Sequence, residues 1–213
     1  MEQETALALF TLKQETTGFM VATHCSTQRI DHSITIVTSP DLSALLKGEI
    51  LLTTQPHTAW GAAVTAQMYV PIAREQAWQQ LTTYSRWVEF FPALTQSQVI
   101  AGTQRTSSLG RHQHLRQVAR KDFWLFTAQA EVELEVIERP DYRAQFSLRS
   151  GCFQDFAADL KLQALAEGTW LRYSVQATPV MPIPSVFIQQ AIQLDLPNNL
   201  RQMRQILCQT VAK

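Results

Sequence analysis

The densest group of side chains that could do chemistry begins at His112. His112, His114 and Arg116 alternate along a predicted strand, so their side chains share one of its faces, and a charged turn follows from Arg120. Imidazole and guanidinium groups can orient a carbonyl or a head group. One interpretation is a polar cluster of His112, His114 and Arg120 at the mouth of a binding cavity. A solvated sheet face with a charged hairpin explains the same residues, so both interpretations stay open.

The histidine pair could also contribute to a metal site, because imidazole nitrogen is a common zinc ligand. His112 and His114 have no convincing third ligand in the sequence, so we predict no bound metal. The three cysteines, Cys25, Cys152 and Cys208, lie far apart and lack the spacing of metal ligands. Their odd number is typical of reduced thiols, and we expect a cytoplasmic protein.

Two carboxylates, Asp155 and Asp159, share one predicted strand face with Lys161. Paired carboxylates can transfer protons, but this arrangement equally suits a solvated surface. The sequence has no G-x-S-x-G nucleophile pattern and no glycine-rich phosphate-binding motif. We therefore predict no catalytic residue and no cofactor.

Aromatic side chains gather in a short stretch of predicted helix. They are Trp78, Tyr84, Trp87, Phe90 and Phe91. Such a cluster can cap the end of a core, or it can form a ligand gate or a lip that touches a membrane. The sequence leaves these alternatives open.

The composition of the 213 residues is that of a globular protein, with 46% hydrophobic and 17% charged residues. Eighteen basic and eighteen acidic residues cancel. Nucleic-acid-binding domains usually carry a basic excess, so we predict no nucleic-acid partner. No apolar run reaches the roughly 18 residues of a transmembrane helix, and the N-terminus does not resemble a secretory signal.

The order of predicted elements indicates an α+β fold. Strands at 49–54 and 62–70 precede two short helices, and strands at about 96–101 and 111–119 follow. The clearest alternation of apolar and polar residues is in 124–137, and further alternating runs follow at 142–148, 154–164 and 171–177. We predict a curved antiparallel sheet of about six to seven strands, with the short helices after the first strand. Residues 49–213 form the domain. Residues 1–48 are a loosely structured extension with one small capped helix near Ser39.

A long helix from Pro184 to Val211 should lie across the sheet. Ile188, Ile192, Leu196, Leu200, Met203 and Leu207 form one apolar stripe at about 100° per residue. Phe187, Ala191 and Leu194 form a second stripe in the first half, so this half must cover two surfaces. The second surface could be a neighbouring segment, an apolar ligand or a membrane. Pro197 should kink the helix or restart it.

Several stretches of this chain resemble the START-like, or SRPBCC, superfamily with its helix-grip fold, over about residues 49–211. The resemblance rests on PIAREQAWQQLTTYSRWVEFFP at 71–92, RKDFWLF at 120–126, GCFQDFAADLKL at 151–162, and residues 176–204. Within the superfamily, the chain looks most like the polyketide cyclase/dehydrase and coenzyme Q-binding branch.

The resemblance implies binding or carriage of an apolar small molecule, such as a lipid, an isoprenoid or a quinone, between sheet and helix. Small inward residues such as Ala128, Ala144 and Ala158 allow either a cavity or close packing. Alternation and resemblance together predict the residues that line the cavity. They are Tyr69, Trp87, Phe91, Phe126, Phe146, Phe156, Tyr173, Phe187 and Ala191.

Two further functions stay open. A polyketide aromatase or cyclase would need a polar residue deep in the cavity, and the predicted lining offers only Tyr69 and Tyr173. An interaction module could instead bind a protein, or touch a membrane peripherally, through residues 184–195.

Overall fold

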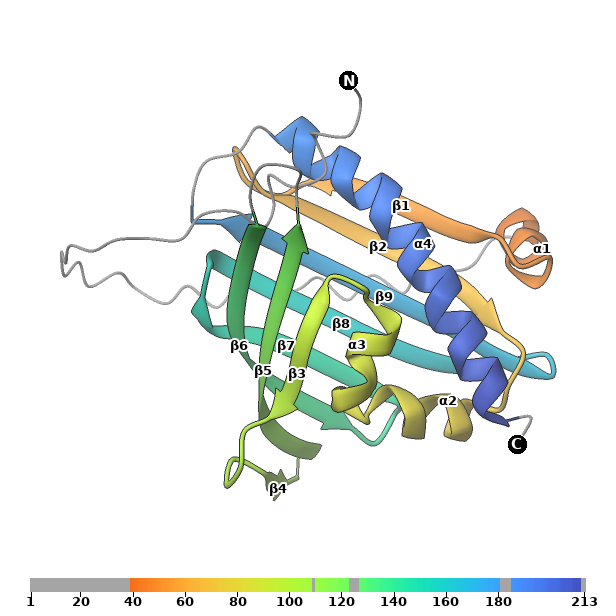
Figure 1. The fold of residues 1–213 in the computed structure, drawn as a ribbon. Coiled ribbons are helices and arrows are strands. Elements are labelled where there is room, and N and C mark those ends of the chain that lie inside the picture. Colours follow the sequence, from red (N-terminus) through yellow and green to blue (C-terminus); the bar gives the residue numbers. More distant parts are fainter. Residues whose placement is uncertain (1–38, 109, 123–126, 181–184, 212–213) are drawn as a thin grey trace, which may run out of the picture.

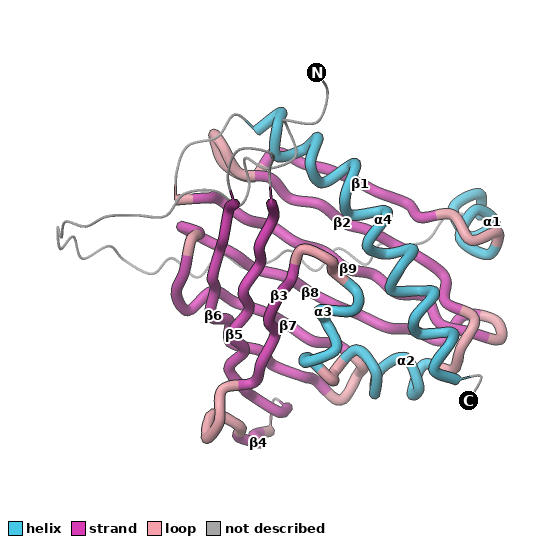
Figure 2. Tube along the Cα trace, in the orientation of Figure 1, coloured by secondary structure: helices cyan, strands magenta, loops and turns pink. Residues whose placement is uncertain are grey.

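One curved antiparallel sheet carries the short helices and the long C-terminal helix on one of its faces (Figure 1). The computed structural model describes residues 39–108, 110–122, 127–180 and 185–211. In these residues the sheet has nine strands in the order β1-β2-β9-β8-β7-β6-β5-β3, and β4 pairs with β5. Figure 2 shows the helices gathered on the same side of this sheet. The architecture is the predicted α+β helix-grip fold.

The elements follow one another along the chain as an early hairpin, short helices, a long antiparallel run and a final helix. Their bounds are α1 Ser39–Leu46, β1 Ile50–Pro56, β2 Ala62–Val70, α2 Arg74–Leu81, the 3-10 helix η1 Tyr84–Arg86, α3 Trp87–Phe90, β3 Leu94–Val99, β4 Arg105–Ser107, β5 Gly110–Asp122, β6 Thr127–Arg139, β7 Arg143–Gly151, β8 Phe153–Leu165, β9 Gly168–Pro179 and α4 Ser185–Val211.

Strand alternation decides which side chains enter the core. In β2, buried residues alternate with half-buried ones from Ala62 to Val70. In β8, Ala158, Leu160 and Leu162 are buried, and their neighbours point to the outer face. The alternation predicted for residues 154–164 is therefore confirmed. Its cause is the two-residue period of a strand with one dry and one wet face.

The predicted strand count was too low. The three-residue strand β4 has only exposed side chains, so it leaves no alternation in the sequence. The short helices also follow the second strand rather than the first. The chain first makes the β1–β2 hairpin, in which Ile50 pairs with Met68 and Pro56 with Ala62.

The terminal helix α4 is continuous over 27 residues and contains Pro197. The predicted restart at Pro197 is therefore wrong. A proline inside a helix removes one backbone hydrogen bond, and helical bonding resumes on either side. Leu200, Met203 and Leu207 are buried against the core, as their spacing predicts. The side chains of residues 185–192 and of Leu194 lie outside those that the structure describes.

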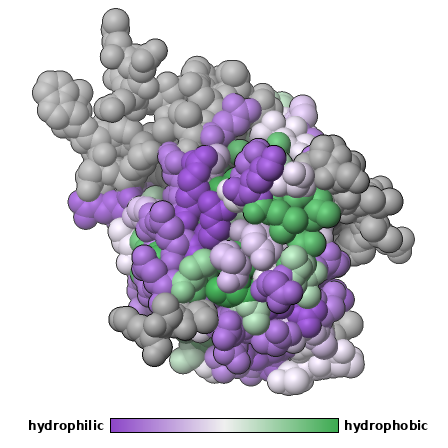
Figure 3. All heavy atoms as spheres, turned by 90° about the vertical axis from the view of Figure 1, so that its right-hand side faces the viewer, coloured by the Kyte–Doolittle hydropathy of each residue, from purple (hydrophilic) through white to green (hydrophobic). Residues whose placement is uncertain are grey.

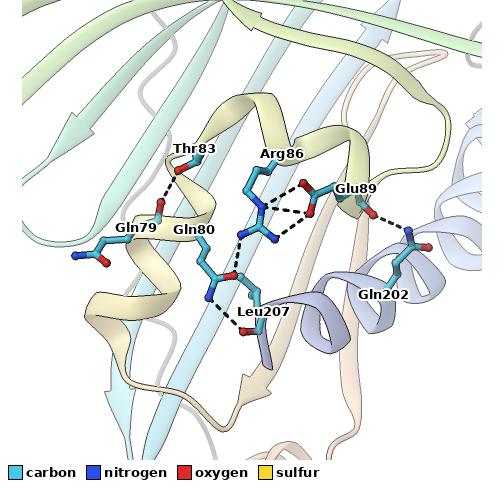
Figure 4. A network of polar contacts seen from close by, with 7 residues as sticks. All are labelled: Gln79, Gln80, Thr83, Arg86, Glu89, Gln202 and Leu207. Atoms are coloured by element: carbon cyan, nitrogen blue, oxygen red, sulfur yellow. Dashed lines mark hydrogen bonds and ion pairs between the residues drawn. The ribbon is translucent and has the colours of Figure 1, made fainter. Parts of the chain in front are cut away.

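Polar contacts fasten the short helices to the C-terminal half of α4 (Figure 4). The Gln202 amide donates to the Glu89 carbonyl at 2.6 Å, and the Gln80 amide donates to the Leu207 carbonyl at 3.2 Å. Arg86 joins this group through Gln80 and through an ion pair with Glu89 at 2.8 Å. These bonds hold α2, α3 and α4 as one layer over the sheet.

The predicted small helix near Ser39 is present as α1, which contacts β1 and β2. Leu45 is fully buried, and the Arg204 guanidinium of α4 donates to the Gly48 carbonyl at 2.7 Å. The domain boundary between residues 48 and 49 stays a prediction. The side of the molecule in Figure 3 mixes polar and apolar areas, and the exposed large apolar residues of the described chain are Leu46 and Val180.

Candidate functional site

An aromatic cluster forms the centre of the layer between sheet and helices. The Trp87 ring centroid lies 5.3 Å from that of Phe146, 5.5 Å from Phe91 and 6.3 Å from Tyr173. Tyr84 meets Phe146 edge-on at 6.0 Å. These separations are those of favourable aromatic pairs. The cluster therefore provides a continuous aromatic wall on the covered side of the sheet.

Local structure explains why these rings meet. Tyr84, Trp87 and Phe90 are three residues apart in η1 and α3, so one face of this helical segment carries all three, and all three are buried. Phe146 and Tyr173 stand on the covered face of β7 and β9, where strand alternation brings them. The aromatic stretch predicted as an end cap or gate is thus part of the core.

Tyr173 contributes a hydroxyl group to this wall. The side chain is 9% exposed, and its hydroxyl has no hydrogen-bond partner among the described residues. Burial raises the pKa of Tyr173 well above its ordinary value. The hydroxyl is therefore neutral at physiological pH and can both donate and accept.

A second polar group lies at the end of the core and was missed from the sequence. The Glu138 carboxylate accepts hydrogen bonds from the Tyr84 hydroxyl at 3.0 Å, from the Gln113 amide and from the Arg111 guanidinium at 3.0 Å. Gln113 is fully buried. Burial, together with the Glu138 charge, raises the pKa of Tyr84 far above its ordinary value. The sequence feature that could have indicated this polar group is Gln113, because it is a polar residue on the strand face opposite His112 and His114.

A pocket of about 480 Å³ opens beside this carboxylate network. Its lining is mostly polar and comes from residues 82–85, from the end of β3, from Gln104 and from the start of β5. The residues are Thr82, Thr83, Tyr84, Ser85, Gln98, Val99, Gln104, Arg111 and Gln113. The Glu138 carboxylate and the Arg111 guanidinium are already paired with each other, so the network serves to hold η1 against β5 and β6.

The structure brings several predicted lining residues together. Trp87, Phe146 and Tyr173 are buried in the core cluster, and Phe91 and Phe156 are partly buried against it. Tyr69, also predicted to line the cavity, lies on the half-buried face of β2. Tyr69 alternates with the core residues Met68 and Val70, and its hydroxyl lies over Gly168. Tyr69 has a hydroxyl and an apolar ring, so its residue type suits either face of a strand. Phe126 and the side chains of Phe187 and Ala191 lie outside the described set.

His112, His114 and Arg120 were predicted at a cavity mouth, and the structure places them away from the aromatic wall. They alternate with Gln113, Leu115 and Ala119, which face the core, so they lie on the outer face of β5. His112 contacts Ser107 at 3.0 Å and Glu135 at 3.8 Å. His112 and His114 line a surface pocket of about 720 Å³ together with Gly102, Thr103, Arg105, Thr106, Ser107, Glu135 and Arg149.

The two aspartates considered for acid–base work are held by polar contacts at the outer face. Asp159 contacts the Arg143 guanidinium at 2.6 Å, and Asp155 contacts the His57 ring nitrogen at 2.8 Å. These contacts link β7 to β8, and β8 to the turn after β1. Within the described residues, no three histidine, cysteine or acidic side chains gather as a metal site. No helix of the described part is long and apolar enough to cross a membrane.

Comparison with known proteins places this geometry in a wider group. Residues 70–204 match the family model described as "Polyketide cyclase / dehydrase and lipid transport". Among curated proteins, none matches the sequence significantly.

Solved structures share the fold at low sequence identity. A START superfamily protein from Mycobacterium smegmatis is 13% identical, with a TM-score of 0.59 over 70% of this chain and 98% of its own. TTHA0849 from Thermus thermophilus is 16% identical, with a TM-score of 0.58 over 70% and 98%. The Zhui aromatase/cyclase from Streptomyces sp. R1128 is 9% identical, with a TM-score of 0.55 over 76% and 96%.

Proposed function

Because this chain belongs to the polyketide cyclase/dehydrase and lipid transport family, we propose that it binds an apolar small molecule between its curved sheet and its helices. The observation that carries the proposal is the aromatic wall of Trp87, Phe91, Phe146 and Tyr173, which the sheet and α3 hold on the covered side. Binding would come mainly from apolar burial, at roughly 25 cal/mol per Å².

The class of ligand can be narrowed from the shape of this wall. Aromatic side chains favour flat or extended apolar partners, because ring faces give large contact areas at little cost in conformational freedom. We therefore favour a lipid-like or quinone-like molecule, in a role of binding or carriage. A cyclase remains the alternative function, and it would use Tyr173, since that hydroxyl is part of the wall.

Native mass spectrometry of the intact protein purified from its own cells tests the proposal. We expect a co-purifying apolar molecule of defined mass, which solvent extraction releases and identifies. The protein, once extracted, should regain mass when the recovered molecule is added back. A protein that stays free of ligand, and gains no mass from lipids or quinones, would contradict the proposal.

Filling the proposed space gives a second test. Ala158 is 3% exposed and pairs with Phe146 across the sheet, so Ala158→Leu adds three carbons on the covered face. If that face borders space for a ligand, the variant should displace the ligand without losing stability. In a filled core, the same change should cost about 1–3 kcal/mol. The matched control is Ala157→Leu, which adds the same group on the outer face of the same strand and should leave ligand binding intact.

The predicted contact with a protein or a membrane through residues 184–195 stays a proposal. Most side chains of this segment lie outside the described set, although the backbone of residues 185–195 is helical. Removing residues 184–195 should abolish ligand binding if the segment covers the ligand. An interaction module would keep its fold and lose only its partner.

A further inference from the structure

The Tyr173 hydroxyl differs from three other aromatic donor groups of the described residues, which have protein partners. The Tyr84 hydroxyl donates to Glu138, the Trp87 ring nitrogen donates to the Leu81 carbonyl at 2.8 Å, and the Trp170 ring nitrogen donates to Gln67 at 3.1 Å. Among the described residues, the side-chain atom that is fully buried without a partner is Arg172 Nε, so the Tyr173 hydroxyl itself is not closed off from solvent. A water molecule or a ligand atom should therefore complete its hydrogen bonding.

The neighbours of Tyr173 show where such an atom would lie. On β2 the residue opposite Tyr173 is Ala66, which is fully buried, and on β8 the residue opposite is Leu160. A tyrosine ring reaches much further from the sheet than an alanine methyl group. The hydroxyl thus stands in the layer between the sheet and the helices, where Phe91 and Trp87 flank the ring at 6.4 Å and 6.3 Å.

We propose that Tyr173 selects the ligand by hydrogen-bonding one oxygen atom, a carbonyl or a hydroxyl, on an otherwise apolar and flat molecule. This inference rests on the proposed function and adds a specificity rule to it. The ligand's oxygen replaces any water on Tyr173, so an oxygen-bearing molecule keeps the bond. A pure hydrocarbon of the same shape leaves the buried hydroxyl unpaired and binds less tightly.

Two probes of the same shape test this rule on the full chain. 2-Naphthol carries a hydroxyl where 2-methylnaphthalene carries a methyl group. Both affinities are measured by calorimetry, or by competition, for the wild-type protein and for Tyr173→Phe. We expect the ratio of the two affinities to shift by about 2- to 12-fold toward the hydrocarbon in Tyr173→Phe, which is the range for one net hydrogen bond. Comparing ratios cancels the different hydrophobicities of the probes.

The control variant is Tyr142→Phe, since the Tyr142 hydroxyl contacts Glu75 at the surface. It makes the same chemical change away from the wall, and its affinity ratio should equal that of the wild type. If both probes bind and the ratio is the same in Tyr173→Phe as in the wild type, Tyr173 does not select the ligand, although the proposed function stands. If neither probe binds the wild-type protein, the proposed function and the role of Tyr173 are both overturned.

A measurement without ligand tests the premise separately. Because the Tyr173 hydroxyl has no partner among the described residues, Tyr173→Phe should leave the midpoint of denaturant unfolding unchanged or raise it. Tyr84→Phe removes a hydroxyl that is bonded to Glu138 and should lower the midpoint. An equal fall in both variants would show that Tyr173 has a protein partner, and the selection rule would be overturned.

Discussion

Glu138 illustrates how single residues hold the end of this core. Its side chain is 10% exposed, and three groups from η1 and β5 donate to it. A carboxylate removed from water is costly unless hydrogen bonds and an opposite charge compensate it. Here Tyr84, Gln113 and Arg111 compensate Glu138, so each of these residues contributes to stability through the others.

The Tyr84 hydroxyl is a buried donor of this network that a single substitution removes. We expect Tyr84→Phe to lower the free energy of unfolding by about 1.5–3 kcal/mol, because the lost bond ends on a charged group. Chemical denaturation measures this change. Tyr142→Phe, whose hydroxyl bonds to Glu75 at the surface, should change the free energy by no more than about 0.5 kcal/mol. Equal effects of the two variants would contradict a structural role of the network.

At the scale of elements, the buried side chain of Leu45 packs α1 on the domain. Leu45 is 0% exposed, whereas its neighbour Leu46 is 46% exposed. Arg204 of α4 also bonds to the Gly48 carbonyl just after α1. The helix therefore packs on the same core as β1 and β2.

A pair of neighbouring substitutions tests this attachment. Leu45→Ala should lower the free energy of unfolding by about 2–5 kcal/mol, the usual cost of truncating a buried leucine. Leu46→Ala makes the same chemical change on the exposed side and should cost about 0.5 kcal/mol or less. Denaturant unfolding of the full chain measures both. A small effect at Leu45 would place α1 outside the cooperative unit and favour the predicted loose extension.

The helix α4 tolerates Pro197 in its interior at a cost in stability. Proline lacks the N–H that an interior position needs, and an interior proline is about 3 kcal/mol less favourable than alanine. We expect Pro197→Ala to raise the free energy of unfolding by up to this amount, as measured by thermal or denaturant unfolding. A loss of stability would show that the local helix geometry at Pro197 is needed for packing.

At the scale of the whole molecule, the deprotonation of two buried tyrosines from different elements is coupled to unfolding. Burial raises the pKa of both Tyr84 and Tyr173 above the ordinary value of 10.0. The folded protein therefore holds these two protons more tightly than the unfolded chain does. Their contribution to stability is fully present below about pH 10 and is lost as the pH rises above it.

This linkage predicts alkaline unfolding. We consider the part of the pH dependence that the tyrosines determine. For this part, the midpoint of denaturant unfolding should be nearly constant from pH 8 to about pH 9.5 and should fall steeply above about pH 10. Absorbance at 295 nm should show a tyrosinate signal that rises together with unfolding. The double variant Tyr84→Phe and Tyr173→Phe should lose much of this signal. A full tyrosinate signal in the folded protein would contradict the burial of both rings.

Much of this fold could be predicted because its strands have one dry and one wet face. Phe146, Ala158 and Tyr173 were expected to face the core from alternation, and they do. The stripe of Leu200, Met203 and Leu207 was likewise enough to predict the core side of α4. A strong contrast between the two faces of an element fixes its orientation before its partners are known.

The sequence pattern was least informative where the two faces of a strand differ little in polarity. In β5, His112 and His114 alternate with Gln113, so both faces carry polar residues and the pattern cannot choose between them. In β2, Tyr69 suits either face. Folding decided these cases by what each face meets. The Gln113 amide donates to Glu138 in the neighbouring strand, and the Tyr69 hydroxyl lies over Gly168.

The amino-acid sequence by itself determined the order of elements, their periodicity and the α+β architecture, because these depend on contacts between near neighbours. Only the tertiary structure decided which polar groups are satisfied, because their partners come from distant segments. Tyr84 and Glu138 are 54 residues apart and form a bond, whereas Tyr173 has none among the described residues. Whether a buried hydroxyl has a partner depends on three-dimensional packing, and here that packing singles out Tyr173.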